Sequence, residues 1–232
     1  MVFLLLGFLQ ASALGQPEDG RSLIRPVPEG GGPTRIHCTM AVLDVDEISD
    51  ADQNFTVNLF THFQWSDPRE AHGGEGKIIK PITEVWHPHI VFLNRQRIWA
   101  SMDGIVEISP NGDVVFRQQF WGDFSQPMNL REFPFDTQSF SITCVAAGPE
   151  EFGELELVQN PKFSSFIVKE YSVADWKVIH SDVSSDPLVL PTGDQTEAFA
   201  FVFTAKRLSN HFVIKVIAPL LMIMVLSMVV FW

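Results

Sequence analysis

Short runs of alternating apolar and polar residues, separated by turn residues, fill the sequence from Arg35 to Lys206, and this pattern constrains the fold most. The runs that we expect to be strands are residues 36–43, 55–65, 105–108, 114–121, 139–145, 155–158, 163–168, 176–182 and 198–206. Strands this short, without a convincing amphipathic helix between them, are typical of a β-sandwich. The sequence therefore predicts an all-β, immunoglobulin-like sandwich over residues 35–208, with residues 44–53 as an acidic loop.

The two ends of the chain differ from this pattern. Residues 1–14 are apolar and end in small residues, which is typical of a secretory signal peptide. Residues 15–34 are rich in Gly, Pro and charge, and we expect a flexible lead-in there. Residues 209–232 carry one charge, Lys215, and about 20 apolar residues span a bilayer as a helix. We therefore expect a transmembrane helix that contains Pro219.

Composition excludes several classes of protein. The formal net charge of −12 argues against a nucleic-acid partner and suits attraction of cations or simple solubility. The two cysteines, Cys38 and Cys144, are too few for a disulfide framework; they form either one long-range bridge or two buried thiols, and we favour the thiols. Zinc ribbons, phosphate-binding glycine loops and nucleophile elbows are absent from the sequence, so we predict no enzyme activity and no cofactor.

Residues 126–140, QPMNLREFPFDTQSF, make a poor helix and a poor strand. Pro134 fixes its own φ and pushes Phe133 toward extended geometry, so we expect an ordered turn between strands. Phe133 and Phe135 are costly to leave in water, and the turn should therefore dock its rings onto an apolar surface. Asp136 then lies at a buried edge and needs a cationic partner.

This segment resembles the signature loop of the pentameric ligand-gated ion channels, the Cys-loop receptor family. In animal members two cysteines close the loop; Gln126 and Phe140 stand at those positions here, so the disulfide is absent, as in the prokaryotic branch. The resemblance covers residues 34–232. It implies a bacterial-type channel subunit in the cell membrane, with an extracellular or periplasmic N-terminal domain. It also implies a homopentamer that binds a small-molecule agonist and passes ions, which the acidic surface predicts to be cations.

A second match lies in the strand 55–65. Its even-numbered face is polar apart from Phe60, and His62 lies on that face. A single exposed Phe is common and by itself indicates little. Residues 57–69, however, resemble the family's strand that leads into Trp-x-Asp-Pro-Arg. By this resemblance Phe60 occupies the ligand-facing aromatic position on the complementary side of the site, and His62 belongs to the same ligand-binding set.

The strand that follows the predicted turn at 110–113 contributes two further residues. Arg117 and Gln119 share one face of it, and a cation and an amide directed the same way could hold an anionic ligand group. For an isolated strand, a solvated polar face is the alternative interpretation. In the family, the positions of Arg117 and Gln119 face the ligand from the complementary subunit.

Trp86–Ile90, WHPHI, resembles the family's Trp-x-Pro-Asp segment that leads into loop A, with His89 in place of the aspartate. His87 and His89 beside Glu84 could also be zinc ligands, but no third ligand is located, so we favour His89 as a packing or proton-sensing residue. The ligand-binding set that the resemblance implies is completed by Leu93, Ala147 and Phe199.

Few aromatic residues surround the implied ligand site. The hairpin that should cap it, residues 183–196, contains none, and neither does the loop 146–149. A cage for a quaternary amine needs several ring faces around one cation, so ligands that resemble acetylcholine are disfavoured. A small carboxylate, an amine held by acids and an aromatic acid remain open.

The resemblance also implies residues that couple the sandwich to the membrane helices. Arg207 precedes Pro219 by twelve residues, as the family's arginine at the strand-to-membrane junction precedes its helix proline. Asp136 is the expected counter-charge, and Asp50 and Asp52 lie on the membrane side in that fold. The remaining members of this coupling set are Phe133, Pro134 and Phe135.

Other classes share part of the pattern. A membrane-anchored extracellular binding or adhesion domain would use the same sandwich without a pore. A hydrolase would need a clustered acid–base pair, which we do not find. Trp176 is expected to be a core residue.

Overall fold

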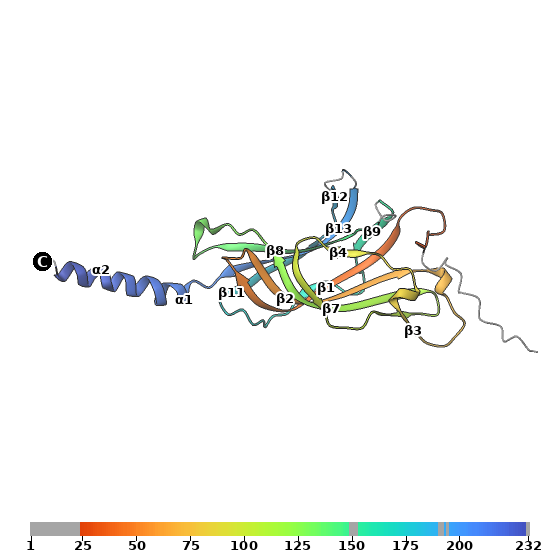
Figure 1. Ribbon diagram of the computed structural model, residues 1–232, viewed down its shortest axis with the longest axis horizontal. Helices are drawn as coiled ribbons and strands as arrows, with labels where there is room; N and C mark the ends of the chain where they lie inside the picture. The colour runs from red at the N-terminus through yellow and green to blue at the C-terminus, as the bar shows by residue number, and fades with distance from the viewer. Residues whose placement is uncertain (1–23, 149–152, 190–192, 194, 231–232) are drawn as a thin grey trace, which may run out of the picture.

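The structure is a computed structural model that describes residues 24–148, 153–189, 193 and 195–230. The predicted signal peptide, residues 1–14, lies outside the described residues. Figure 1 shows an elongated body of strands, with the helical C-terminal segment extending from one end and β12 standing out from the side.

The described strands form two sheets. The larger has the order β10–β1–β2–β7–β6–β3, with β9 paired to β1 and β5 paired to β7. Its strands are β1 (Thr34–Ser49), β2 (Asn54–Ser66), β3 (Ile78–Pro81), β5 (Arg95–Ala100), β6 (Ile105–Ile108), β7 (Asp113–Ser125), β9 (Leu155–Gln159) and β10 (Phe166–Ile167). The smaller has the order β11–β13–β8–β4, with β12 paired to β13. Its strands are β4 (Ile90–Phe92), β8 (Thr137–Ala146), β11 (Trp176–Ser184), β12 (Pro187–Val189) and β13 (Gln195–Arg207).

The core lies between the sheets and is rich in phenylalanine. The ring of Phe55, on β2, lies 5.7 Å from that of Phe124 on β7, 5.2 Å from that of Phe140 on β8 and 5.6 Å from that of Phe203 on β13, measured between centroids. All four side chains are fully buried. Each long strand alternates inward apolar residues with outward polar ones, which joins the two sheets into one core. The predicted all-β sandwich is therefore confirmed.

The same core contains the residues expected to be buried. Cys38 and Cys144 are both fully buried free thiols, as predicted. Burial raises the pKa of the Cys144 thiol to about 12. Trp176 is also buried, with its ring 5.7 Å from that of Phe140.

The prediction of an acidic loop at residues 44–53 is wrong for residues 44–49, because these residues belong to β1. Register shifts on either side of Asp44 and Val45 mark β-bulges in the pairing with β2. Asp44 accepts hydrogen bonds from the backbone and the hydroxyl of Ser172, each at 2.6 Å. The carboxylate of Asp46 accepts from the indole of Trp121 at 2.6 Å. The acidic side chains thus find partners outside the core while the backbone stays paired.

Other strand boundaries also differ from expectation. The short strands β3, β4 and β5 were not predicted, and the strand expected at 163–168 is reduced to Phe166–Ile167. The turn at 110–113 is confirmed: Gly112, with φ at +84°, donates its N–H to the carbonyl of Ser109 at 2.9 Å. A Cβ on Gly112 would lie 2.5 Å from the carbonyl oxygen of Asp67, so only glycine fits there.

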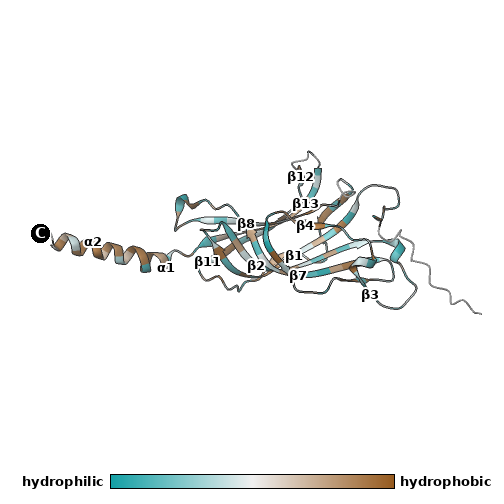
Figure 2. Cartoon of the chain, in the orientation of Figure 1, coloured by the Kyte–Doolittle hydropathy of each residue, from teal (hydrophilic) through white to brown (hydrophobic). Residues whose placement is uncertain are grey.

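The C-terminal segment consists of α1 (Asn210–Phe212), a π-helical turn (Val213–Ile217) and α2 (Ala218–Val230). Pro219 is the second residue of α2, directly after the π-helical turn, which suits a residue without an N–H donor. Figure 2 shows predominantly hydrophobic residues along α2. Among the described residues, no single helix combines the length and the apolar character needed to cross a membrane.

Candidate functional site

Four predicted site residues lie together on β2 and β7. In the antiparallel register, Phe60 is opposite Gln119 and His62 is opposite Arg117. Directly opposed residues on neighbouring strands have Cβ atoms about 5 Å apart, so these four side chains form one patch. We call Phe60, His62, Arg117 and Gln119 the β2–β7 patch.

The polar members of the patch are held by neighbours on the same face. Arg117 donates to Glu107, on β6, at 2.5 Å, and Lys77 donates to the same carboxylate at 2.8 Å. These hydrogen bonds, that from Lys77 first and that from Arg117 second, lower the pKa of Glu107. The amide of Gln119 donates to Asn58 at 2.8 Å. An anionic ligand group would therefore compete with Glu107 for the Arg117 guanidinium.

His62 differs from its neighbours because only 7% of its surface is exposed. Its ring packs edge-on against Phe163, with centroids 5.4 Å apart, and its Nδ1 has no hydrogen-bond partner. Burial first, and the charge of Arg117 second, lower the pKa of His62, so the ring is neutral near pH 7. The prediction of His62 as a ligand-facing residue is not retained, because its ring is buried against Phe163.

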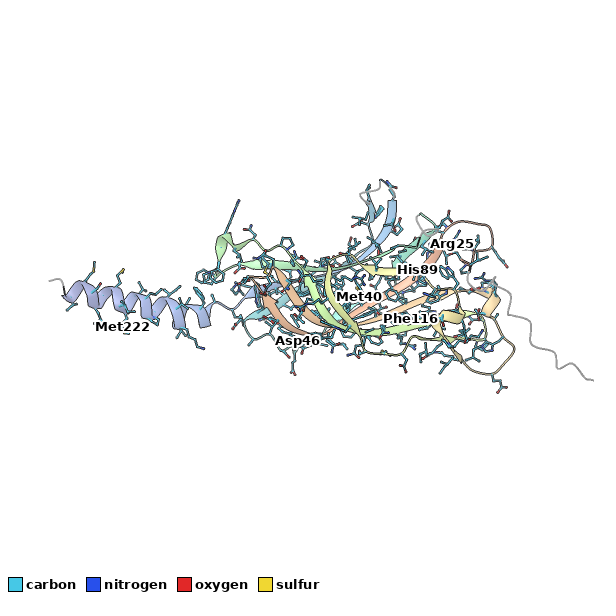
Figure 3. The ribbon with its side chains drawn as sticks, viewed as in Figure 1. Arg25, Met40, Asp46, His89, Phe116 and Met222 are labelled. Carbon is cyan, nitrogen blue, oxygen red and sulfur yellow. The ribbon has the colours of Figure 1, made fainter. Side chains whose placement is uncertain are left out.

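A second candidate site is a cavity of about 430 Å³ near β4. It lies between the segment 87–92, Ala147 and the inward rings of Phe63, Phe116 and Phe120. Ala147 is exposed and donates its N–H to the carbonyl of His89 at 2.9 Å. Leu93, which was also predicted to bind the ligand, follows this segment directly and is 45% exposed. His89 and Phe116, which both line the cavity, are labelled in Figure 3.

The structure does not support the prediction that Phe199 binds the ligand. Its side chain is fully buried in the core, where β13 pairs with Cys144 of β8. A ring in that position stabilises the sandwich and is not exposed to a ligand. We therefore remove Phe199 from the candidate site.

The patch and the cavity lie on opposite faces of the larger sheet. Phe116 and Phe120 line the cavity, whereas Arg117 and Gln119 alternate with them on β7 and point the other way. The structure thus brings each half of the predicted site together, but it does not bring the two halves together within one chain.

Three of the residues predicted to couple the sandwich to the helix, Asp50, Phe133 and Asp136, lie around Arg207, the last residue of β13. Its Nε donates to Asp136 Oδ1 at 2.7 Å, and its Nη2 donates to Asp136 Oδ2 at 3.2 Å and to Asp50 Oδ1 at 2.7 Å. The guanidinium carbon lies 4.1 Å from the ring centroid of Trp176 and 4.9 Å from that of Phe133. The side chain of Arg207 is 11% exposed, so this is a largely buried ion cluster with cation–π contacts.

The partner expected for Asp136 is therefore present. Burial would raise the pKa of Asp136, but hydrogen bonds from Arg207 and Gln138 outweigh it, and the pKa is lowered. Burial would likewise lower the pKa of Arg207, and its bonds to Asp136 and Asp50 raise it. Asp136 and Arg207 thus remain charged together. Asp52 is not part of the cluster, because its carboxylate accepts from Ser49 at 2.9 Å.

The 126–140 segment contacts the start of the C-terminal helical segment. The Phe133 ring lies edge-on to that of Phe212 in α1, with centroids 4.9 Å apart, and the Phe133–Pro134 peptide bond is cis. Phe135 does not dock as expected: it is 61% exposed. Only one of the two rings at the turn is therefore held by this chain.

Three residues that contact Arg207, Asp136 or Phe133 were not predicted from the sequence as members of this cluster. Trp176 was expected only as a core residue, but its ring also contacts the guanidinium of Arg207. Trp176 on β11 and Arg207 on β13 are paired directly in the sheet. Gln138, which donates to Asp136 at 2.7 Å, gave no signal in the sequence. Phe212 was part of an apolar run in which no single position is distinguished.

The chain thus combines a β-sandwich, a polar patch on one sheet and a largely buried ion cluster beside the C-terminal helical segment. The comparisons with known proteins specify the class. Residues 18–173 match the neurotransmitter-gated ion-channel ligand binding domain. The chain therefore belongs to that family, the Cys-loop pentameric ligand-gated channels, whose members are receptors and not enzymes.

Similar curated proteins include the gamma-aminobutyric acid receptor subunits alpha-6 of Gallus gallus and alpha-4 of Rattus norvegicus. Each is 25% identical to this chain over 219 residues, which is 88% of the chain. The aligned part covers 46% of the first relative and 39% of the second. The chain thus spans less than half of the length of these relatives.

Proposed function

We propose that the chain is the ligand-binding part of a channel subunit, in which a small molecule binds between neighbouring subunits and drives opening of a transmembrane pore. The Arg207 cluster is the observation that carries this proposal. It ties together β13, the 126–140 segment and Asp50, next to the start of α1. A buried ion pair adds little net stability over apolar packing, but it suits an element with two arrangements.

The interface site follows from the separation of the two half-sites. The β2–β7 patch of one subunit would face the β4 cavity, Ala147 and Leu93 of the next. Phe60 supplies a ring, and Arg117 and Gln119 supply donors, so the favoured agonist is a small carboxylate or amino acid. Two relatives are named for gamma-aminobutyric acid, an amino acid, which is consistent with this chemistry.

The remaining features of the channel belong to the same proposal. The subunits form a homopentamer in the cell membrane, with the sandwich outside and residues 209–232 as the first transmembrane helix. The acidic charge of −12 favours cations near the pore entrance. Gln126 and Phe140, in place of the loop cysteines, support a prokaryotic-type member. Residues 1–14 would be removed as a signal peptide, and residues 15–34 would lead into the sandwich.

The coupling role is tested by exchanging charges in the protein that carries this domain, with currents measured by voltage clamp in oocytes. Arg207→Asp and Asp136→Arg should each abolish the current evoked by a panel of amino acids and aromatic acids. The double variant, which restores opposite charges, should recover at least part of it. Asp52→Asn is the matched control, because Asp52 is near the cluster without bonding to Arg207. A silent double variant that reaches the cell surface would contradict the pairing.

The agonist site is tested in the same cells. Phe60→Ala and Arg117→Gln should raise the half-maximal agonist concentration about tenfold or more, since a lost charge-assisted hydrogen bond is worth roughly 1.5–3 kcal/mol. Neither change should alter surface expression. If the unaltered protein reaches the surface, carries no current and is a monomer in detergent, a membrane-anchored binding domain without a pore would replace the channel.

A further inference from the structure

The β4 cavity can hold a kind of ligand group that the β2–β7 patch cannot. It has a volume of about 430 Å³ and is lined from both sheets, with the exposed His89 and Ala147 at its mouth. Figure 3 shows His89 and Phe116 in the half of the sandwich away from α2, on which Met222 is labelled. The cavity is therefore separate from the Arg207 cluster beside α1.

Two aromatic rings contribute accessible surface to this cavity. Phe116 and Phe120 lie on the side of β7 that points into the sandwich, yet both are only half-buried. Because both rings line the cavity, the surface that they leave uncovered is available to a molecule inside it. The ring of Phe120 lies edge-on to that of Phe92, with centroids 5.4 Å apart, so the wall is held in place by the core. Aromatic rings pack well against one another in edge-on and offset arrangements, and an aromatic ligand suits this wall.

The walls exclude charged groups. Among the described residues that line the cavity, none is Asp, Glu, Lys or Arg. The polar side chains near the mouth are those of His87 and His89, whose ring centroids lie 5.4 Å apart. A charged group that leaves water for such surroundings pays a large desolvation cost without a charged partner. The cavity therefore selects uncharged groups, whereas the guanidinium of Arg117 suits an anion on the outer face of the sheet.

His87 offers a hydrogen-bond acceptor at the wall. Its Nδ1 lies 3.2 Å from the carbonyl oxygen of Val85, which can only accept, so Nδ1 carries the proton of the neutral ring. Nε2 is then the acceptor, and within the described part of the chain it is not one of the buried atoms that lack a partner. A ligand hydroxyl or N–H can therefore donate to it.

The volume limits the size of the ligand. An apolar cavity of about 150 Å³ holds benzene. The β4 cavity is larger than that, and it can hold one substituted ring or two fused rings. Water finds few hydrogen-bond partners along these walls, so its displacement by an apolar ring is favourable.

We infer that the β4 cavity binds a small uncharged aromatic molecule with one hydrogen-bond donor, such as a phenol or an indole, within a single chain. The ring packs against Phe116 and Phe120, and the donor is directed to His87. The cavity is also one half of the proposed interface site, so any effect on gating rests on the proposed function, whereas the binding itself does not.

Isothermal titration calorimetry of the purified full chain tests the inference, with phenol as the ligand and benzoate as the matched charged probe. The comparison is made in Arg117→Gln, in which the β2–β7 patch has lost its cation. Phenol should bind at least tenfold more tightly than benzoate. In a crystal soaked with 4-bromophenol, the anomalous signal of bromine should lie inside the cavity. A channel that carries no current would contradict the proposed function and would leave these binding results unaffected.

Ala147→Phe is the decisive variant. Ala147 is exposed, so the change spares the core, and the larger side chain narrows the mouth of the cavity. The affinity for phenol should fall at least tenfold. Ala100→Phe is the matched control, because Ala100 is exposed on β5 and does not line the cavity, and it should leave the affinity unchanged.

His87→Phe tests the hydrogen bond. It should weaken the binding of phenol several-fold and leave that of toluene, which has no donor, unchanged. The inference would be overturned by unaltered phenol binding in Ala147→Phe, by equal affinities for phenol and benzoate, or by bromine found only outside the cavity. Equal losses of phenol and toluene in His87→Phe would likewise overturn the role of His87 as the acceptor.

Discussion

Charged residues in this chain differ sharply in how many contacts their side chains make and in how exposed they are. Arg207 is held by two carboxylates and two aromatic rings, with 11% of its side chain exposed. Arg35 pairs with Glu156 at 2.9 Å, but 60% of its side chain is exposed. A buried pair that loses one partner leaves an uncompensated charge, whereas an exposed pair is replaced by water.

This contrast gives the first prediction. Arg207→Gln should lower the free energy of unfolding by about 3–5 kcal/mol, because Asp136 stays buried without its cation. Arg35→Gln, the surface control, should lower it by less than about 1 kcal/mol. Urea unfolding of the purified chain measures both. Similar losses in the two variants would show that the Arg207 cluster is not effectively buried.

The neutral ring of His62 gives a prediction about pH. Burial, and next the charge of Arg117, lower its pKa in the folded chain, while Glu107 and Lys77 act in opposite directions on the same face. The unfolded chain has the ordinary pKa near ~6.5 and binds more protons below it, so stability present above that pH is lost as the pH falls. His62→Gln should reduce the change in unfolding free energy between pH 7.5 and 5.5.

Urea unfolding at a series of pH values checks this expectation. His37, whose pKa is also lowered, should keep part of the slope in His62→Gln. An unchanged slope in that variant would mean that His62 is protonated as readily in the folded as in the unfolded chain.

At the scale of elements, the sequence predicted the long strands well and the short ones poorly. The strands β2, β7 and β13 carry apolar residues at many alternating positions, because one face of each is buried along most of its length. The short strands β3 and β5 contain mostly exposed or half-buried residues, so no alternation marks them. The acidic part of β1 was not predicted as a strand because β-bulges interrupt its pairing with β2. Its hydrogen-bond partners Ser172 and Trp121 also lie far away in the sequence.

The close pairing of β5 with β7 gives an element-scale prediction. A Cβ on Gly122, in β7, would lie 2.2 Å from the carbonyl oxygen of Arg97 and 2.8 Å from the Cα of Ile98, both in β5. Gly122→Ala should therefore force the strands apart and destabilise the chain by about 1–3 kcal/mol. Thermal unfolding compares it with Gly73→Ala, where a Cβ would have open space. Equal midpoints would contradict the close approach.

At the scale of the whole molecule, the sequence placed Phe60, Arg117 and Gln119 on neighbouring strands but could not show how the two sheets cover their faces. The alternation on β2 and β7 was sufficient to group Phe60 with Arg117 and Gln119. The burial of Phe199 and the exposure of Phe135 depend on which sheet covers which face, and that is decided by contacts between residues distant in sequence.

The two buried thiols report on the integrity of the whole sandwich. Cys38 lies on β1 of the larger sheet and Cys144 on β8 of the smaller, and burial raises the pKa of both. At pH 8 a thiol reagent should therefore label neither residue in the native chain and both after denaturation. Mass spectrometry counts the labels. Rapid labelling of the native chain would show that the sheets separate far more readily than this core allows.

The length of β13 and its pairing on both edges determine how the strand responds to a displacement of either end. The strand has 13 residues, from Gln195 beside the capping hairpin to Arg207 beside the helix, and so spans about 40 Å. It is paired along most of that length on both edges, to β8 and to β11. A strand held in this way cannot lengthen without breaking two rows of hydrogen bonds. We therefore expect a displacement at the Gln195 end of β13 to be transmitted along the paired strand to Arg207.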